Sequence, residues 1–514
     1  MSMLSNKAKF IRSLMEAKRR YDTTVNPHLV STRLPGSVDP HSLTGEKKLN
    51  IGMKYMTDPE QVEKIGNKLT VINTEKQREK ASEKGKAPPR MMPNIGLDML
   101  RKHRTPRGII DALGSQIERN LEFGMDRAMS LPELADRSQH WYVGARDISQ
   151  KIGSAYGIPH EKMAGVIATQ SPQKDWYMNA SLAERIAKIH TQHKSTRWSK
   201  EMEIAARKKR GEDKNPVFNL DDEEHRKLYK AIRGKSYGEL TDPMHQAAWI
   251  RTFDEAHHPR RYRILTPEGE MGGFAKNKDG RESDISWGDF GSIAKAVRIL
   301  DSEGTPESIS PHLGQEHKVR SFYNNILQPN APKRVSDVTV DTHAIGSALG
   351  RYNISTATPD LSQFMGGAGS VETGQRGLYP LIKDKFEKLA GERGIIGNAA
   401  QSIIWDTKRA DSTTEGQDKE INQTWEQFRA GAIPHKKVLS SLSAILGPAK
   451  PASWMKIKPT KFTSTFESTN HKGKLLTEMN SPNKYGHITT TGILSKEALK
   501  ESLQNFIRGI YLRG

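Results

Sequence analysis

Residues 163–190, MAGVIATQSPQKDWYMNASLAERIAKIH, are the stretch that decides the fold class. Small and aliphatic side chains fill positions 163–168, which predicts a buried helix. Ser171 and Pro172 predict the start of a second helix, because serine accepts a backbone N–H at an N-cap and proline suits the first helical position. Two packed helices with a break between them follow from this pattern. The second helix carries on one face Trp176, Ala180, Ala183 and Ala187.

Apolar residues recur at helical spacing through most of the central chain, and no internal repeat is present. The stretch ILTPEGEMGGF at 264–274 instead predicts a hairpin, because it is rich in glycine and turn residues. We therefore expect a mainly α protein with a few short strands. The expected helices lie within 98–122, 133–156, 244–257, 290–300, 315–328, 379–392 and 398–409.

Composition divides the 514 residues into three parts. Residues 1–95, rich in polar residues and ending in a Pro-Pro linker, predict an extended basic arm rather than a domain. Residues 96–430 are the helical core, and we expect a charged, exposed insertion in it at about 190–290. Residues 431–514 are a basic C-terminal region, with 13 Lys and Arg against four Asp and Glu.

The charge balance points to a polyanionic partner. Eighty Lys and Arg against 60 Asp and Glu give a net charge of +20, which is most often associated with nucleic-acid binding. The absence of cysteine excludes disulfides, thiolate nucleophiles and cysteine-bound zinc, and fits a reducing compartment. We expect no membrane span and no signal peptide, because no sufficiently long apolar run occurs.

The break at 170–174 is a first candidate site. It presents Gln170, Gln173 and Lys174 near a helix N-terminus, where the positive end of the helix dipole favours phosphate. A capped kink beside a core Trp176 explains the same residues without any ligand. Both interpretations stay open from the sequence.

A second candidate site lies in residues 334–351, RVSDVTVDTHAIGSALGR. An alternating extended run leads to Asp341 at the N-cap of a helix, and Gly350 is a plausible stop. Backbone N–H groups keep a capping aspartate ionised, so the carboxylate could act on a substrate or a water; a capping role alone explains it equally well. His343 is a phosphate or carboxylate partner or a surface residue. We predict no metal site here, because the H-E-x-x-H spacing is absent.

Three segments, in order, resemble the helix-hairpin-helix DNA glycosylases of the endonuclease-three type. They are AGVIATQSPQKDW at 164–176, GQEHKVRSFYNNI at 314–326 and VTVDTHAIGSALGR at 338–351. The resemblance implies a helical glycosylase-like core with no metal or organic cofactor. Residues 328–337 contain neither the family's Gly-rich DNA-gripping hairpin nor its Schiff-base lysine, so β-lyase activity is not expected.

The resemblance also implies roles for individual residues. Asp341 would stabilise an oxocarbenium-like transition state and activate water, with His343 beside it as a second catalytic candidate. Glutamines of the break would fill the gap left by a flipped base, basic residues would contact phosphates, and amides would bind a base edge. The residues implied to bind nucleic acid are Gln170, Ser171, Gln173, Lys174, Trp176, Asn179, Lys318, Arg320 and Asn324.

A second resemblance is to an uncharacterised group of tailed-bacteriophage proteins, which implies a location in the host cytoplasm or the virion. Three functions remain open: a DNA glycosylase-like hydrolase, a catalytically inactive DNA-binding module, and a packaged or ejected virion protein that contacts DNA or other virion subunits. The oligomeric state is also left open. The shared residues are Trp141-Tyr142, Ser171-Pro172-Gln173, Trp176, Asn179, Asp341-Thr342-His343, Tyr379-Pro380, Gln401, Ile403 and Trp405.

Overall fold

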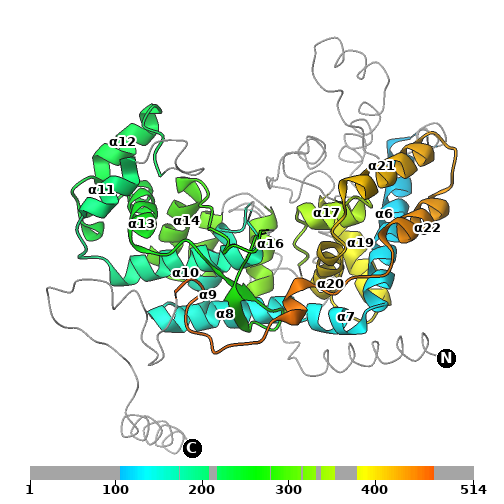
Figure 1. Ribbon diagram of the computed structural model, residues 1–514, viewed down its shortest axis with the longest axis horizontal. Coiled ribbons are helices and arrows are strands. Elements are labelled where there is room, and N and C mark those ends of the chain that lie inside the picture. The colour runs from blue at the N-terminus through cyan, green and yellow to red at the C-terminus, as the bar shows by residue number, and fades with distance from the viewer. Residues whose placement is uncertain are drawn as a thin grey trace, which may run out of the picture. The chain divides into compact units, whose positions relative to one another are not determined.

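The protein is mainly helical in the part that the structure describes (Figure 1). The computed structural model describes residues 103, 105–172, 174–207, 217–277, 279–313, 317–331, 337–352 and 379–467. These residues form 16 α-helices and one two-stranded antiparallel hairpin, which confirms the expected class. None of the described helices is long and apolar enough to cross a membrane. The expected N-terminal arm and the chain after Glu467 lie outside the described residues.

A first hydrophobic cluster surrounds helix α9, which packs against α8, α10, α14 and α16. Every residue from Met163 to Thr169 is buried. A Cβ added at Gly165 would lie 3.1 Å from Cγ2 of Ile299, so the small residues of α9 let α14 approach closely. The helices of this cluster are α8 (Trp141–Tyr156), α9 (His160–Thr169), α10 (Trp176–Gln192), α13 (Pro243–His257), α14 (Phe290–Asp301), α15 (Pro306–Ile309) and α16 (His317–Leu327).

The break between α9 and α10 differs from the sequence expectation. Helix α10 begins at Trp176, and its N-cap is Asp175, whose side chain accepts the backbone N–H of Met178 at 2.9 Å. Ser171 is therefore not the cap that the sequence predicts. Ser171 is only 4 % exposed and lies before the helix. Asp175, four positions later, caps the helix instead.

The charged stretch expected as an exposed insertion also contributes to the core. Helices α11 (Lys200–Arg207) and α12 (Glu223–Ile232) pack against α13. Met202 and Ile232 are buried, while the charged residues other than Glu203, which accepts from Tyr229 of α12 at 2.5 Å, are exposed. The two helices are therefore amphipathic, which the count of charges alone does not reveal.

A second hydrophobic cluster is built on α6, which packs against α17, α19 and α20 (Figure 1). Leu113, Ile117, Leu121 and Met125 recur every four residues on α6 and are all buried, so one stripe of this helix forms the contact. Helix α7 packs against α20. These helices are α6 (Pro106–Met129), α7 (Pro132–Ser138), α17 (Thr342–Ala348), α19 (Tyr379–Glu392) and α20 (Gly397–Ala410).

Helices α21 (Glu415–Arg429) and α22 (His435–Leu446) pack against each other and carry a third cluster. Trp425 is fully buried there, and its indole N–H donates to the carbonyl of Gly350 at 3.0 Å. Gly350 has φ +61°, and a Cβ at this position would lie 2.5 Å from the Trp425 ring, so glycine is required. The described structure thus continues beyond residue 430, where the basic C-terminal region was expected to begin.

The hairpin joins β1 (Arg263–Leu265) to β2 (Met271–Phe274) and begins one residue before the stretch 264–274 that the sequence predicts. The last described segment lies against it: the backbone N–H of Arg263 donates to the carbonyl of Thr465 at 2.7 Å. Lys188 on α10 pairs with Glu467 at 2.6 Å. These contacts attach the end of the described chain to the first cluster.

Candidate functional site

Asp341 caps α17, as the sequence predicts. Its Oδ1 accepts the backbone N–H of Ala344 at 2.8 Å. The hydroxyl of Tyr379 on α19 fixes the extended residues before it, donating to the carbonyl of Val338 at 3.0 Å and accepting the N–H of Val340 at 3.2 Å. Both valines are buried, so the carboxylate projects from an anchored segment.

Asp341 lines a pocket to which the first and second hydrophobic clusters both contribute. The pocket has a volume of about 470 Å³, including the space open to solvent. Helices α8, α10, α16 and α20 and the α9–α10 break supply most of the walls. The lining residues are Trp141, Tyr142, Ser171, Lys174, Trp176, Asn179, Lys318, Phe322, Thr339, Asp341, Gln401, Ser402 and Trp405.

Aromatic rings form much of the wall. The ring centre of Trp141 lies 4.9 Å from that of Trp176, 5.4 Å from that of Trp405 and 6.0 Å from that of Phe322. These distances are within the range of favourable aromatic contacts, and the rings come from four different helices. Such a wall is suited to a flat, apolar-faced ligand.

Several polar atoms in this wall have no hydrogen-bond partner in the described part of the chain. They are Oγ of Ser171, Oδ1 of Asn179 and Nε1 of Trp405. Ser171 is 4 % exposed and Asn179 only 2 % exposed, so each atom has lost its water without gaining a protein partner. Burying such a group costs roughly 1–3 kcal/mol, which a ligand with matching donors and acceptors would offset.

Two lysines contribute positive charge to the same pocket. Lys318 Nζ donates to the carbonyl of Ser171 at 2.9 Å, which ties α16 to the break. Burial and the nearby guanidinium of Arg251 lower the pKa of Lys174. Tyr142 donates its hydroxyl proton to Oε1 of Gln401 at 2.6 Å, and burial raises the pKa of this tyrosine, which stays neutral.

His343 lies beside the pocket and does not line it. Its ring centre is 6.0 Å from that of Trp405, with the two rings nearly perpendicular. Burial lowers the pKa of His343, so the imidazole is neutral at pH 7. The structure brings this residue near Asp341 but does not direct it into the same cavity.

Two residues expected to contact nucleic acid are occupied elsewhere. Arg320 is 0 % exposed, donates to the carbonyl of Ser310 at 2.8 Å and does not line the pocket, so its expected contact with phosphate stays a prediction. Asn324 is also buried, and its amide donates to Asp337 at 2.8 Å. Both side chains hold the turns around α16 rather than lining the pocket.

Gln170 is not among the lining residues either. It is buried, and its amide donates to the carbonyl of Ser292 on α14 at 2.9 Å. Gln173 lies outside the described residues. The break therefore contributes Ser171 and Lys174 to the pocket.

The sequence does not predict a site role for the other seven lining residues, which are Trp141, Tyr142, Phe322, Thr339, Gln401, Ser402 and Trp405. The one available signal was the place of some of these residues in the short motifs W-Y and Q-x-I-x-W, which carry no chemistry by themselves. The lining residues that were predicted are Ser171, Lys174, Trp176, Asn179, Lys318 and Asp341.

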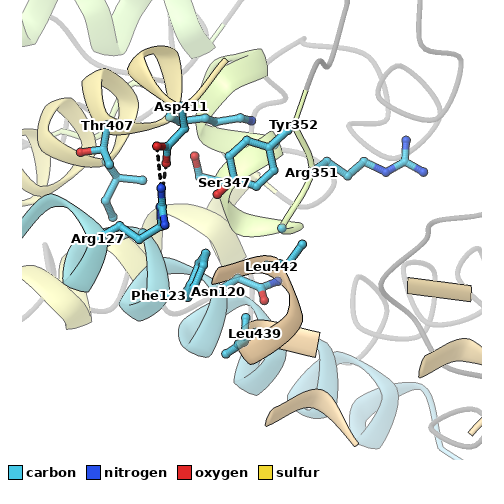
Figure 2. A pocket seen from close by; sticks show the side chains of 15 residues that line it. Asn120, Phe123, Arg127, Ser347, Arg351, Tyr352, Thr407, Asp411, Leu439 and Leu442 are labelled. Atoms are coloured by element: carbon cyan, nitrogen blue, oxygen red, sulfur yellow. Dashed lines mark hydrogen bonds and ion pairs between the residues drawn. The ribbon is translucent and has the colours of Figure 1, made fainter. Parts of the chain in front are cut away.

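A second pocket of about 380 Å³, again including open space, lies between α6, α17, α20 and α22 (Figure 2). Figure 2 shows Arg127 and Asp411 joined in a two-pronged ion pair, with distances of 2.6 and 2.7 Å. Arg127 also donates to the carbonyl of Gly447 at 2.9 Å. Burial lowers the pKa of Lys408 in this pocket to about 7, and its ammonium donates to the carbonyl of His343 at 3.3 Å. These contacts make this pocket a structural junction.

No cluster of three or more His, Cys, Asp or Glu suited to a metal ion occurs among the described residues. The first pocket holds a single acidic group, Asp341, beside two lysines. This donor set fits an organic ligand better than a metal ion, since divalent ions need several anionic or neutral donors.

Comparison with known proteins gives one similarity. No curated protein and no solved structure matches the chain. The glycosylase and bacteriophage resemblances therefore stay predictions. Residues 127–245 are similar to a family of unknown function (DUF7178), a stretch that contains Trp141, Ser171, Lys174, Trp176 and Asn179 of the pocket but not Asp341.

Proposed function

We propose that the protein hydrolyses the N-glycosidic bond of a DNA base held in the pocket lined by Asp341. One observation carries this proposal: a carboxylate, two lysines and an aromatic wall line a single cavity. A net charge of +20 adds a general attraction for nucleic acid.

A nucleobase matches the chemistry of this cavity. Enzymes that act on a base turn it out of the helix into a pocket, where it stacks on aromatic side chains and is read along its polar edge. Trp141, Trp176 and Trp405 supply stacking surfaces. Ser171 and Asn179 supply a hydroxyl and an amide for the edge.

Asp341 would serve the bond cleavage itself. As the bond between C1′ and the base nitrogen breaks, its electron pair leaves with the base and positive charge develops on the sugar. A carboxylate stabilises that charge and takes a proton from the attacking water, whose oxygen bonds to C1′. The proton then passes to the departing base. Water is the only co-reactant required.

The test is base release by wild-type protein and the Asp341→Asn variant. Asparagine caps helices as well as aspartate does, so this change removes the charge and keeps the fold. Substrates are single- and double-stranded oligonucleotides carrying uracil, hydroxymethylated or oxidised bases. Asp222→Asn is the matched control, because Asp222 also caps a helix, α12, through the N–H of His225 at 3.0 Å but does not line the pocket.

The proposal expects base release by the wild type and by Asp222→Asn, with at least a 100-fold loss in Asp341→Asn. DNA binding should persist in all three proteins. Salt-dependent binding without release from any substrate would overturn hydrolysis and favour a binding or virion role. Absence of binding at low salt would overturn the nucleic-acid assignment altogether.

A further inference from the structure

Arg409 is an exposed cation stacked beside the pocket. It lies four residues after Trp405 in the last turn of α20, so both side chains share one helix face. The guanidinium carbon is 4.7 Å from the ring centre of Trp405 and 6.0 Å from that of Tyr177. Arg409 forms no ion pair with any carboxylate in the described part of the chain.

The contact with the Trp405 ring orders the Arg409 guanidinium for binding an anion. A cation held over an indole face keeps its plane fixed, and its N–H groups point outward along the edge of that plane. Such an edge can donate two parallel hydrogen bonds to a phosphate, and less entropy is lost because the side chain is already ordered. Since Trp405 lines the base pocket, an anion bound there would lie next to the occupant of that pocket.

A second positive group lies on the pocket wall. Lys174 precedes α10, and the nearby guanidinium of Arg251 adds to the positive field. The cavity itself has an aromatic wall, which suits a base, and Lys174 and Lys318 also line it. Arg409 adds a third cation beside Trp405 at its edge.

We infer that Arg409 forms a phosphate subsite next to the base pocket, so that the substrate is a nucleotide carrying a phosphoester and not a free nucleoside or base. This inference rests on the proposed function, because it takes the pocket occupant to be a base. The phosphate belongs to a DNA strand or to a free mononucleotide, and the net charge of +20 favours the strand.

The experiment compares the binding of a nucleoside, its 5′-monophosphate and a trinucleotide by calorimetry. The proteins are the wild type, Arg409→Ala and the control Arg207→Ala. Arg207 is also an exposed arginine, and it lies at the end of α11 with its guanidinium 3.7 Å from the carboxylate of Glu203. Arg409→Ala removes a charge-assisted hydrogen bond and should weaken the binding of the trinucleotide roughly 10- to 100-fold, while the affinity for the nucleoside stays unchanged. The slope of log affinity against log salt concentration should fall by about 0.7 for the trinucleotide.

The outcomes separate this inference from the proposed function. If Arg409→Ala loses as much affinity for the monophosphate as for the trinucleotide, the subsite binds the phosphate of a free nucleotide. If it loses affinity for the trinucleotide alone, the subsite binds the phosphate of a strand. Equal losses for nucleoside and trinucleotide would overturn it, because Arg409 would then only support Trp405. Trinucleotide binding that changes no more than in Arg207→Ala would overturn it too. If the wild type binds the trinucleotide and the same trinucleotide lacking its central base equally well, the base pocket fails instead.

Discussion

Replacing Asn179 by leucine should stabilise the fold and abolish base binding. Asn179 lies on α10, is 2 % exposed, and its Oδ1 has no partner in the described part of the chain. Leucine has the same number and branching of side-chain heavy atoms. The variant therefore removes an unpaired polar group without deleting a protein hydrogen bond.

The magnitude follows from that unpaired acceptor. A buried polar atom without a partner costs roughly 1–3 kcal/mol. Leucine also has a higher helix propensity than asparagine, by about 0.5 kcal/mol. The free energy of unfolding of Asn179→Leu should accordingly rise by about 1–3 kcal/mol, since natural binding sites trade stability for function.

Asn325 is the matched control. It is 1 % exposed, but its amide donates to Thr339 at 3.0 Å and its carbonyl oxygen accepts from Asn398 at 3.3 Å. Asn325→Leu removes both hydrogen bonds and should lower the free energy of unfolding by about 2–4 kcal/mol. Urea denaturation followed by circular dichroism measures both variants. If Asn179→Leu is destabilised as much as Asn325→Leu, the Asn179 amide supports the fold and the reasoning about the pocket is refuted.

Three further predictions concern the framework around the site. Burial lowers the pKa of His193 to about 3, so below pH 6.5 the unfolded chain binds a proton at this histidine that the folded chain does not bind. The free energy of unfolding should therefore fall by about 2 kcal/mol between pH 6.5 and pH 5. Urea denaturation at both pH values should show a smaller fall for His193→Gln. A Cβ at Gly144 would lie 2.1 Å from the carbonyl oxygen of Pro267, so Gly144→Ala should cost about 1–3 kcal/mol and lower Tm; an unchanged Tm would contradict this contact. Arg127→Met leaves the buried carboxylate of Asp411 unpaired and should lower the free energy of unfolding by about 3–5 kcal/mol in urea denaturation. Adding Asp411→Asn to this variant should restore part of that free energy.

The local elements could be predicted from the sequence because their signals are local. The helix expected at 379–392 spans Tyr379–Glu392, and the Asp341 cap and the Gly157 stop, at φ +67°, follow from capping chemistry within one turn. The position of the α10 cap was wrong because Ser171 and Asp175 are both good capping residues. Long-range packing makes the choice: Ser171 is buried against Lys318, 147 positions away.

Burial of charged and polar side chains could not be read from the sequence. The sequence places Arg320 on a helix, where we expect it to contact phosphate. It is buried because the chain brings the carbonyl of Ser310 to its guanidinium. The aromatic wall is also non-local: Trp141, Trp176 and Trp405 meet across more than half of the chain. Periodicity predicts which face of a helix is buried, but not which helices meet there.

The most direct test of the account is a crystal structure of the Asp341→Asn variant bound to an uncleaved oligonucleotide. The account predicts one base extruded into the pocket, in contact with Trp141 and Trp405, with its polar edge hydrogen-bonded to Asn179 and its C1′ facing position 341. A strand bound with every base outside an empty pocket would contradict it.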